Sequence, residues 1–274
     1  MKNKNIIKIV IIIVIVLAII TAATITAVYF IKKSKFNYEI SNVEEYNYSI
    51  FYRDEKYGVI NKKGEIVVEP TYINVQIPNP SKPLFICMSE YNQELGEYEN
   101  KVLNENKEQI LTTYDKVSAI SVESTDTNVP YEKSVLKYKK DGKYGLIDFN
   151  GKELTKPIYD NIIGLDYKEG TLLVSKDEKY GIVNINGAEM IEVKYDSISA
   201  DNYYDTQTKS KKAGFIVSEK TEEGYRYGYI NYNGKRILKP EFTKIERINE
   251  IQGDDIYFIA YKNGQAGLMR NNKC

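Results

Sequence analysis

The sequence predicts an all-β protein of tandem three-stranded antiparallel meanders, preceded by one transmembrane helix. Two observations predict the β repeats: a motif with fixed internal spacing recurs four times, and tight-turn sequences separate short runs of β-forming residues. A third observation, an unbroken apolar run near the N-terminus, predicts the helix. The repeats are compatible with a propeller-like ring and with an open twisted β array.

The first element is the apolar run of residues 9–31. Its 23 residues hold no charged side chain. At about 1.5 Å per residue a helix of this length reaches roughly 34 Å, enough to cross a bilayer core. We expect residues 1–8 to form a short cytoplasmic tail and residues 32–47 a juxtamembrane segment. The alternative is a cleaved secretory signal, for which Ala22 and Ala23 supply small residues.

The orientation of this helix depends on the lysines beside it. Lysines lie on both sides of the apolar run, so the charge asymmetry that sets topology is weak. We expect a single-pass protein of the cell membrane with the repeats outside, and the reverse topology stays open. Cleavage of a signal would export the repeats as well, as a secreted protein.

Charge and composition exclude several functions. Residues 36–274 hold 32 basic and 38 acidic residues, a formal charge of −6, which argues against a nucleic-acid partner. The chain has no histidine, so Ser-His-Asp and Cys-His catalysis and His-based zinc sites are excluded. We expect no enzymatic activity, no cofactor and no metal. For the two cysteines, Cys87 and Cys274, a buried thiol and a free thiol are favoured over a disulfide.

The repeated motif places two aromatic residues 15 positions apart. The four pairs are Tyr57 and Tyr72, Tyr144 and Tyr159, Tyr180 and Tyr195, and Tyr227 and Phe242. A glycine follows each first aromatic, a second glycine comes six residues later, and an apolar residue stands 18 positions after the first aromatic. Those apolar residues are Val75, Ile162, Ile198 and Ile245.

Each copy reads as three strands. Three of the second glycines follow asparagine, and Asn-Gly between apolar runs predicts a type I′ hairpin turn. A further run of β-forming residues precedes each first aromatic and ends in a turn-forming pair such as Asp141-Gly142. Proline stands 13 positions after three of the aromatics, where it should end the third strand or lie on a sheet edge.

Two incomplete copies extend the array over residues 48–274. Residues 83–117 fit a worn copy without either glycine, and a shortened copy ends the chain. Copies therefore start near residues 48, 83, 133, 170, 213 and 255, a period typical of repeat arrays and propellers. Residues 36–43 resemble the end of a unit, so they are candidates to complete the last unit and close a ring.

These residues carry a resemblance to a known family. Tyr-Gly, an apolar residue, Ile or Val, Asn or Asp, then Asn-Gly-Lys, an apolar stretch, Pro and Tyr-Asp is similar to the WG repeat family. This chain has tyrosine where the family usually has tryptophan, and alanine at Ala266 in the last copy. The resemblance implies an all-β repeat protein, often bacterial and exported, without shared catalytic residues.

The shared residues favour structure over function. A tyrosine laid over a neighbouring strand beside a glycine is a packing device, so we expect the Tyr-Gly pairs to form core rather than a ligand platform. The Asp or Asn three residues before each second glycine resembles a calcium-loop ligand, but a role in the turn is favoured.

The best candidate for recognition lies in the longest connector, residues 199–213. Tyr203 and Tyr204, flanked by Asp201 and Asp205, form the candidate ligand-binding site, because tyrosine adds contact area at low entropic cost. A polar loop without a ligand is the alternative.

Three functions remain open at this point. The first is a membrane-anchored extracellular binding or scaffold module for a protein or cell-envelope partner, with the membrane bound through residues 9–31. The second is a carbohydrate-binding or carbohydrate-cleaving propeller that uses loop tyrosines and carboxylates. A structural role within a larger membrane assembly is the third.

Overall fold

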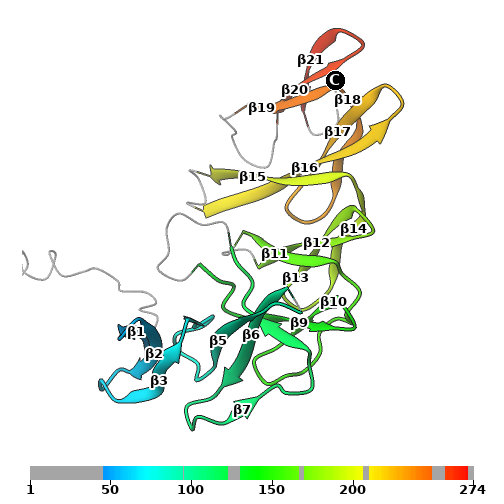
Figure 1. Ribbon diagram of the computed structural model, residues 1–274. Helices are drawn as coiled ribbons and strands as arrows, with labels where there is room; N and C mark the ends of the chain where they lie inside the picture. The colour runs from blue at the N-terminus through cyan, green and yellow to red at the C-terminus, as the bar shows by residue number, and fades with distance from the viewer. Residues whose placement is uncertain are drawn as a thin grey trace, which may run out of the picture. The chain divides into compact units, whose positions relative to one another are not determined.

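The computed structural model describes residues 46–94, 96–122, 130–166, 170–205, 210–248 and 257–270. These residues form an all-β chain of small antiparallel sheets that follow one another in sequence, as Figure 1 shows from blue to red. The predicted all-β repeat class is confirmed. Within this described part no helix is long and apolar enough to span a membrane. The predicted helix of residues 9–31 lies outside it.

The first three sheets occupy the N-terminal half of the described chain. The first sheet contains β1 (Tyr48–Arg53), β2 (Lys56–Asn61) and β3 (Ile66–Tyr72). The second contains β4 (Asn74–Gln76), β5 (Phe85–Asn92), β6 (Glu97–Leu103) and β7 (Gln109–Ile110). The third contains β8 (Lys116–Ser118), β9 (Leu136–Lys140) and β10 (Lys143–Ile147).

The last three sheets complete the series. The fourth contains β11 (Asn161–Asp166), β12 (Thr171–Lys176), β13 (Lys179–Asn184) and β14 (Glu189–Tyr195). The fifth contains β15 (Ser197–Asp205), β16 (Ser210–Thr221), β17 (Gly224–Ile230) and β18 (Arg236–Phe242). The sixth contains β19 (Lys244–Arg247), β20 (Tyr257–Lys262) and β21 (Gln265–Arg270). Within every sheet, strands adjacent in sequence are adjacent in space.

The second, fourth and fifth sheets have four strands each, so the prediction of three-stranded meanders is wrong for them. The additional strand contains the apolar residue that ends each sequence copy. Ile162, for example, lies in β11 opposite Val174 of β12, and Ile198 lies in β15 opposite Val217 of β16. Each copy therefore ends by starting the next sheet, which links consecutive units through backbone hydrogen bonds.

The tight turns also differ from the prediction. Type I′ geometry, with positive φ at both central residues, occurs before three of the four first aromatics, Tyr57, Tyr144 and Tyr180, for example at Asp54-Glu55 (φ 51° and 61°). At the Asn-Gly turns only the glycine has positive φ; Gly187 has φ 80° and its N–H donates to the Asn184 carbonyl at 2.8 Å. This is a type I turn followed by a left-handed glycine.

Residues 83–117, the proposed incomplete copy, contain three strands of the second sheet. This copy forms β5, β6 and β7, and Asn104 shapes its turn as Asn184 does in the fourth sheet. Lys107 takes the place of the glycine, with φ 65°. A non-glycine residue in this conformation is uncommon. Without the glycine, the sequence of this copy lacks the Asn-Gly signal that marks three of the other turns.

The described residues form five apolar core clusters, and each cluster joins two consecutive sheets. Ile182 and Ile191 of the fourth sheet, for example, pack with Phe215 and Val217 of the fifth. The other clusters join the remaining neighbours in the same way. No cluster of the described residues joins the first sheet to the sixth. Residues 36–43, which we considered for ring closure, lie outside the described part.

In the first, fourth and fifth sheets the glycine of the Tyr-Gly pair lies beneath the last strand of the sheet. A Cβ added at Gly181 would lie 2.7 Å from the Ile191 carbonyl oxygen, and one at Gly228 would lie 2.7 Å from that of Leu238. Pro240, directly above Gly228, lies on the edge strand β18, as predicted. The first aromatics pack against the core clusters. Packing within and between the sheets therefore explains why the copies share an aromatic residue followed by glycine.

Candidate functional site

The predicted site at residues 201–205 is not a loop. These residues form the end of β15 and pair with residues 210–214 of β16, so the expected connector is mostly a long hairpin. The structure describes only the backbone of Tyr203, Tyr204 and Asp205, which lie opposite Lys212, Lys211 and Ser210. The charged residues and tyrosines of this hairpin are also typical of a polar loop, which explains the error.

The Asp201 side chain takes part in contacts between the fifth and sixth sheets. Its carboxylate accepts hydrogen bonds from the Tyr229 hydroxyl at 2.9 Å and from Arg247 Nε at 2.5 Å. The Asp201 and Arg247 side chains are 15% and 9% exposed. Because Asp201 is on β15 and Arg247 on β19, this ion pair ties the fifth sheet to the sixth, which gives Asp201 a defined role without a ligand.

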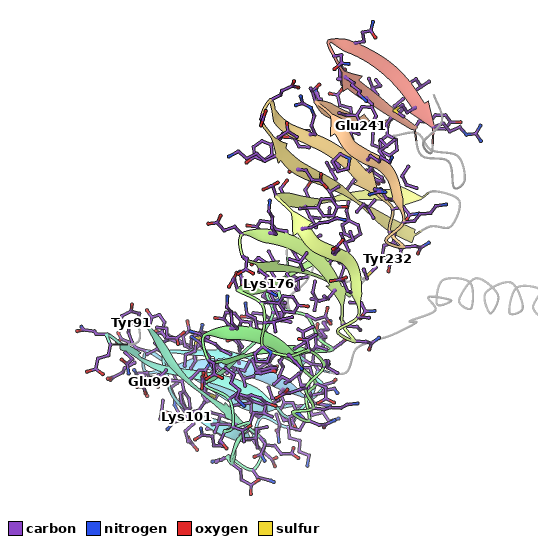
Figure 2. The ribbon with its side chains drawn as sticks, turned by 90° about the vertical axis from the view of Figure 1, so that its right-hand side faces the viewer. Tyr91, Glu99, Lys101, Lys176, Tyr232 and Glu241 are labelled. Carbon is purple, nitrogen blue, oxygen red and sulfur yellow. The ribbon has the colours of Figure 1, made fainter. Side chains whose placement is uncertain are left out.

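A stronger candidate is the hairpin of β5 and β6, which is longer than its counterparts. β5 continues five residues past Cys87, whereas β12 continues two residues past the corresponding Val174. A register shift between Met88 and Tyr91 precedes the extension. Figure 2 shows the labelled Tyr91 and Glu99 on this hairpin. The extension distinguishes the second sheet from its neighbours.

Two exposed tyrosines face each other across this hairpin. Tyr91 and Tyr98 are 52% and 48% exposed, although each ring is a large apolar surface. Their centroids lie 5.1 Å apart in an edge-to-face arrangement. Tyrosine contributes contact area at low entropic cost, and an exposed aromatic pair is typical of a recognition surface.

A polar groove of about 640 Å³ adjoins the tyrosine pair. The hairpin contributes Tyr91 and three carboxylates, Glu90, Glu94 and Glu99, while the first sheet contributes Lys56. These charged side chains give the groove a formal charge of −2. It can therefore pair with cationic groups or accept hydrogen bonds from a ligand rich in donors.

Local hydrogen bonds fix the tip of the hairpin. The Asn92 side chain accepts a hydrogen bond from the Glu94 backbone N–H at 3.0 Å and donates one to Glu99 Oε1 at 3.1 Å. These bonds shape the turn and orient one of the groove carboxylates. The groove is thereby pre-organised before any ligand arrives.

The hairpin is also tied to the third sheet. Glu97 Oε2 accepts a hydrogen bond from Lys116 Nζ at 2.6 Å, and Lys139 Nζ lies 3.5 Å from Glu97 Oε1. The Lys116 hydrogen bond, with the charges of both lysines, holds the pKa of Glu97 below its usual range. Ion pairs with lysines of β8 and β9 therefore hold the hairpin to the third sheet.

A second hollow of about 410 Å³ runs along β1 and is more apolar. Tyr46, Tyr48, Ile50 and Tyr131 line it together with two prolines. The Tyr48 hydroxyl donates to Glu105 at 2.6 Å; burial and this hydrogen bond raise the pKa of Tyr48 to about 12. It lies where the chain enters the described part of the structure, so it is the weaker candidate.

The remaining predicted sites have structural roles. The side chains of Asn61, Asp148 and Asn184 accept backbone hydrogen bonds within their turns, as a turn-forming residue does. Cys87 is buried as a free thiol, whereas Cys274 lies outside the described residues. Among the described side chains, no group of three or more His, Cys, Asp or Glu residues is placed to hold a metal ion.

The candidate surface formed by Tyr91 and Tyr98 was missed in the sequence because the second copy departs from the repeat motif. Its signal was visible as two aromatic-acidic clusters, Glu90-Tyr91 and Glu97-Tyr98-Glu99, on either side of a turn. Only the pairing of Tyr91 with Tyr98 shows that the clusters face each other.

The sheets and clusters define an all-β tandem-repeat protein. The model of the WG containing repeat family matches residues 57–75, 144–180 and 227–265, which confirms the predicted resemblance to this family. No curated protein sequence gives a significant match.

Among solved structures, the chain is similar to one described as the crystal structure of the eukaryotic initiation factor. The identity is 9% and the TM-score is 0.33, with 84% of this chain and 62% of that chain covered. The chain thus spans less than two thirds of that structure's length.

Proposed function

We propose that this chain is a non-catalytic binding module, anchored in the cell membrane through residues 9–31, whose repeats bind a protein or cell-envelope partner outside the cell. The proposal rests on the exposed pair of Tyr91 and Tyr98, which lies beside an acidic groove on the hairpin of β5 and β6. Ion pairs of Glu97 hold this hairpin to the third sheet. The chemistry of the groove favours a partner segment with lysine or arginine side chains, which pair with the carboxylates while their stems pack on the tyrosines.

Site-specific photo-crosslinking in intact cells tests this proposal. A photoreactive phenylalanine analogue replaces Tyr91 or Tyr98 in the full chain, and Tyr225, which is 49% exposed on β17, is the matched control. We expect the same partner to be captured from Tyr91 and Tyr98 but not from Tyr225. Capture that is absent, or equal at all three positions, would contradict the proposal.

A carbohydrate ligand is the second candidate, because tyrosine rings stack on sugars and the groove carboxylates accept hydrogen bonds from hydroxyl groups. The full chain in detergent, applied to a glycan array, separates the two functions. Glycan binding that is lost in a Tyr91→Ala and Tyr98→Ala double variant favours the sugar. A blank array, together with partner capture in cells, favours the protein.

The proposed location has its own test. Cys87 is buried, so a membrane-impermeant maleimide applied to intact cells reports on Cys274. We expect labelling in intact cells and its loss in a Cys274→Ser variant. Labelling of Cys274 only after lysis would place the repeats inside the cell and contradict the extracellular location.

A further inference from the structure

A basic residue directly precedes the first aromatic in all four full copies of the repeat. The four residues are Lys56, Lys143, Lys179 and Arg226. In the second and third of these copies, its partner is the aspartate that follows the second aromatic. Lys143 forms an ion pair with Asp160, and Lys179 Nζ lies 2.7 Å from Asp196 Oδ1. The same basic-acidic pair therefore recurs in the repeat.

The aspartate also fixes the hairpin of the next sheet. Its other carboxylate oxygen accepts a backbone hydrogen bond at or beside the next tight turn. Asp160 Oδ2 accepts from the Asp177 N–H at 2.8 Å, and Asp196 Oδ2 accepts from the Lys220 N–H at 2.7 Å. One carboxylate thus neutralises the basic residue of its own copy and holds the hairpin that follows.

The first copy lacks this aspartate, because Ile73 stands at the equivalent position. The Lys56 ammonium group accordingly has no ion pair or hydrogen bond among the described residues. The last full copy has Thr243 at this position, but there Arg226 Nη2 binds Glu223 Oε2 at 2.5 Å. Of the four basic residues, Lys56 is the one whose charge has no partner in the described part of the chain.

Lys56 and Ile73 both line the acidic groove beside Tyr91. The repeat position that elsewhere holds an aspartate is therefore part of the groove here, and Lys56 lies half-buried in the same groove. The hairpin of β5 and β6 contributes its three glutamates from the second sheet. None of them forms an ion pair with Lys56 in the described structure. The groove thus presents a positive charge from the first sheet and negative charges from the second, without their neutralising one another.

This arrangement of charges selects against partners of a single sign. A segment with only basic side chains would place a cation against Lys56, and one with only acidic side chains would face three carboxylates. We propose that Lys56 binds an acidic side chain of the partner, in place of the missing aspartate, while the groove glutamates bind a basic side chain of the same segment. Lys56 is then a specificity-determining residue. The inference rests on the proposed function, since it concerns the same groove.

Short peptides added to the full chain in detergent are the direct probe. Each consists of glycine and serine with blocked termini, a neutral fluorophore and two charged residues. Mixed peptides carry one lysine and one glutamate, in either order and at several spacings, and the comparison peptides carry two lysines at the same spacings. We expect fluorescence anisotropy to show the best mixed peptide binding about tenfold more tightly than the best two-lysine peptide. Equal or tighter binding of the two-lysine peptide would overturn the inference and leave a groove for basic segments standing.

Variants at Ile73 and Lys56 test the mechanism. Ile73→Asp restores the aspartate of the other copies, so its carboxylate should pair with Lys56 and weaken binding of the mixed peptide about tenfold. Ile73→Asn has nearly the same size without the charge and is the matched control, which should keep most of the affinity. Lys56→Glu should reverse the preference, so that the two-lysine peptide binds more tightly. Equal affinities of the Ile73→Asp and Ile73→Asn chains would overturn the inference.

A Tyr91→Ala and Tyr98→Ala double variant separates this inference from the proposed function. Loss of peptide binding in the double variant, with no effect of Ile73→Asp, overturns the role of Lys56 alone. An effect of Ile73→Asp with unchanged binding in the double variant supports the role of Lys56 and contradicts the tyrosine surface. Absence of binding by every peptide to the parent chain overturns both.

Discussion

The fifth and sixth sheets carry the same repeat but differ in what covers them. Tyr229 of β17 is fully buried between its own sheet and Phe258 of β20, whereas Leu268, at the same repeat position in β21, is 60% exposed. Both sheets pack against the sheet before them. Among the described residues β21 has no second partner strand and no following sheet packs on it, so the burial of a repeat residue is supplied mainly by its neighbours.

The largest expected difference is between a core residue and its exposed counterpart. Ile182→Ala removes a fully buried side chain from the cluster between the fourth and fifth sheets and should lower the free energy of unfolding by about 2–5 kcal/mol. Leu268→Ala should change it by less than about 0.5 kcal/mol. Urea titration followed by tyrosine fluorescence measures both, since the chain has 25 tyrosines and no tryptophan. Equal losses would remove the distinction between the two sheets.

A second prediction concerns the ion pair that joins the two compared sheets. Asp201→Asn leaves the Arg247 guanidinium partly buried without its carboxylate, which should cost about 2 kcal/mol of unfolding free energy. Glu69→Gln is the control, because both side chains of the Lys107–Glu69 pair are 54% exposed and such pairs contribute about 0–1 kcal/mol. If the two variants are equally stable in urea, Asp201 does not hold the sheets together.

Glycine substitutions give a third and smaller contrast. Gly181→Ala forces a Cβ to within 2.7 Å of the Ile191 carbonyl oxygen and should destabilise the fold by about 1–3 kcal/mol. Gly267→Ala meets no atom and should be neutral or stabilising by up to about 1 kcal/mol, because alanine restricts the unfolded chain. Thermal unfolding of both variants checks this, and a destabilised Gly267→Ala chain would show that β21 is covered.

The smallest effect concerns Cys87, which lies between the first two sheets. Burial raises the pKa of its thiol from 9.0 to about 12. The folded state thus binds this proton more tightly than the unfolded state, so its contribution to stability is complete below pH 9 and is lost as the pH rises toward 12. In a Cys274→Ser background, we expect slow reaction with an aromatic disulfide at pH 8 when folded and fast reaction in urea. Equal rates would show an accessible thiol.

The sequence alone predicted strands within each copy, but not the four-stranded sheets that some copies form. The fixed spacing of Tyr180, Gly181 and Tyr195 identified the strands and the close-packed glycine, because a Cβ at this glycine would approach a carbonyl oxygen in all four full copies. It could not show that Ile198 pairs with the following sheet. A run of β-forming residues specifies a strand but not its partner, which depends on contacts between distant residues.

The candidate site was less predictable. Tyr203 and Tyr204 stand out in the sequence as a tyrosine pair among polar residues, yet they lie on a paired strand. Tyr91 and Tyr98 are separated by a turn and come together only through hairpin pairing. Exposure is likewise set by neighbouring sheets, so the sequence of the last copy alone does not distinguish Leu268 from a core residue.

Amide hydrogen exchange of the purified full chain tests the central claim most directly, that burial in this array comes from neighbouring strands and sheets. We predict that all backbone N–H groups of β13 in the ladders with β12 and β14 are protected. In β21, only the N–H groups bonded to β20 should be protected and the alternate ones should exchange rapidly. Uniform protection along β21, equal to that of β13, would contradict the claim.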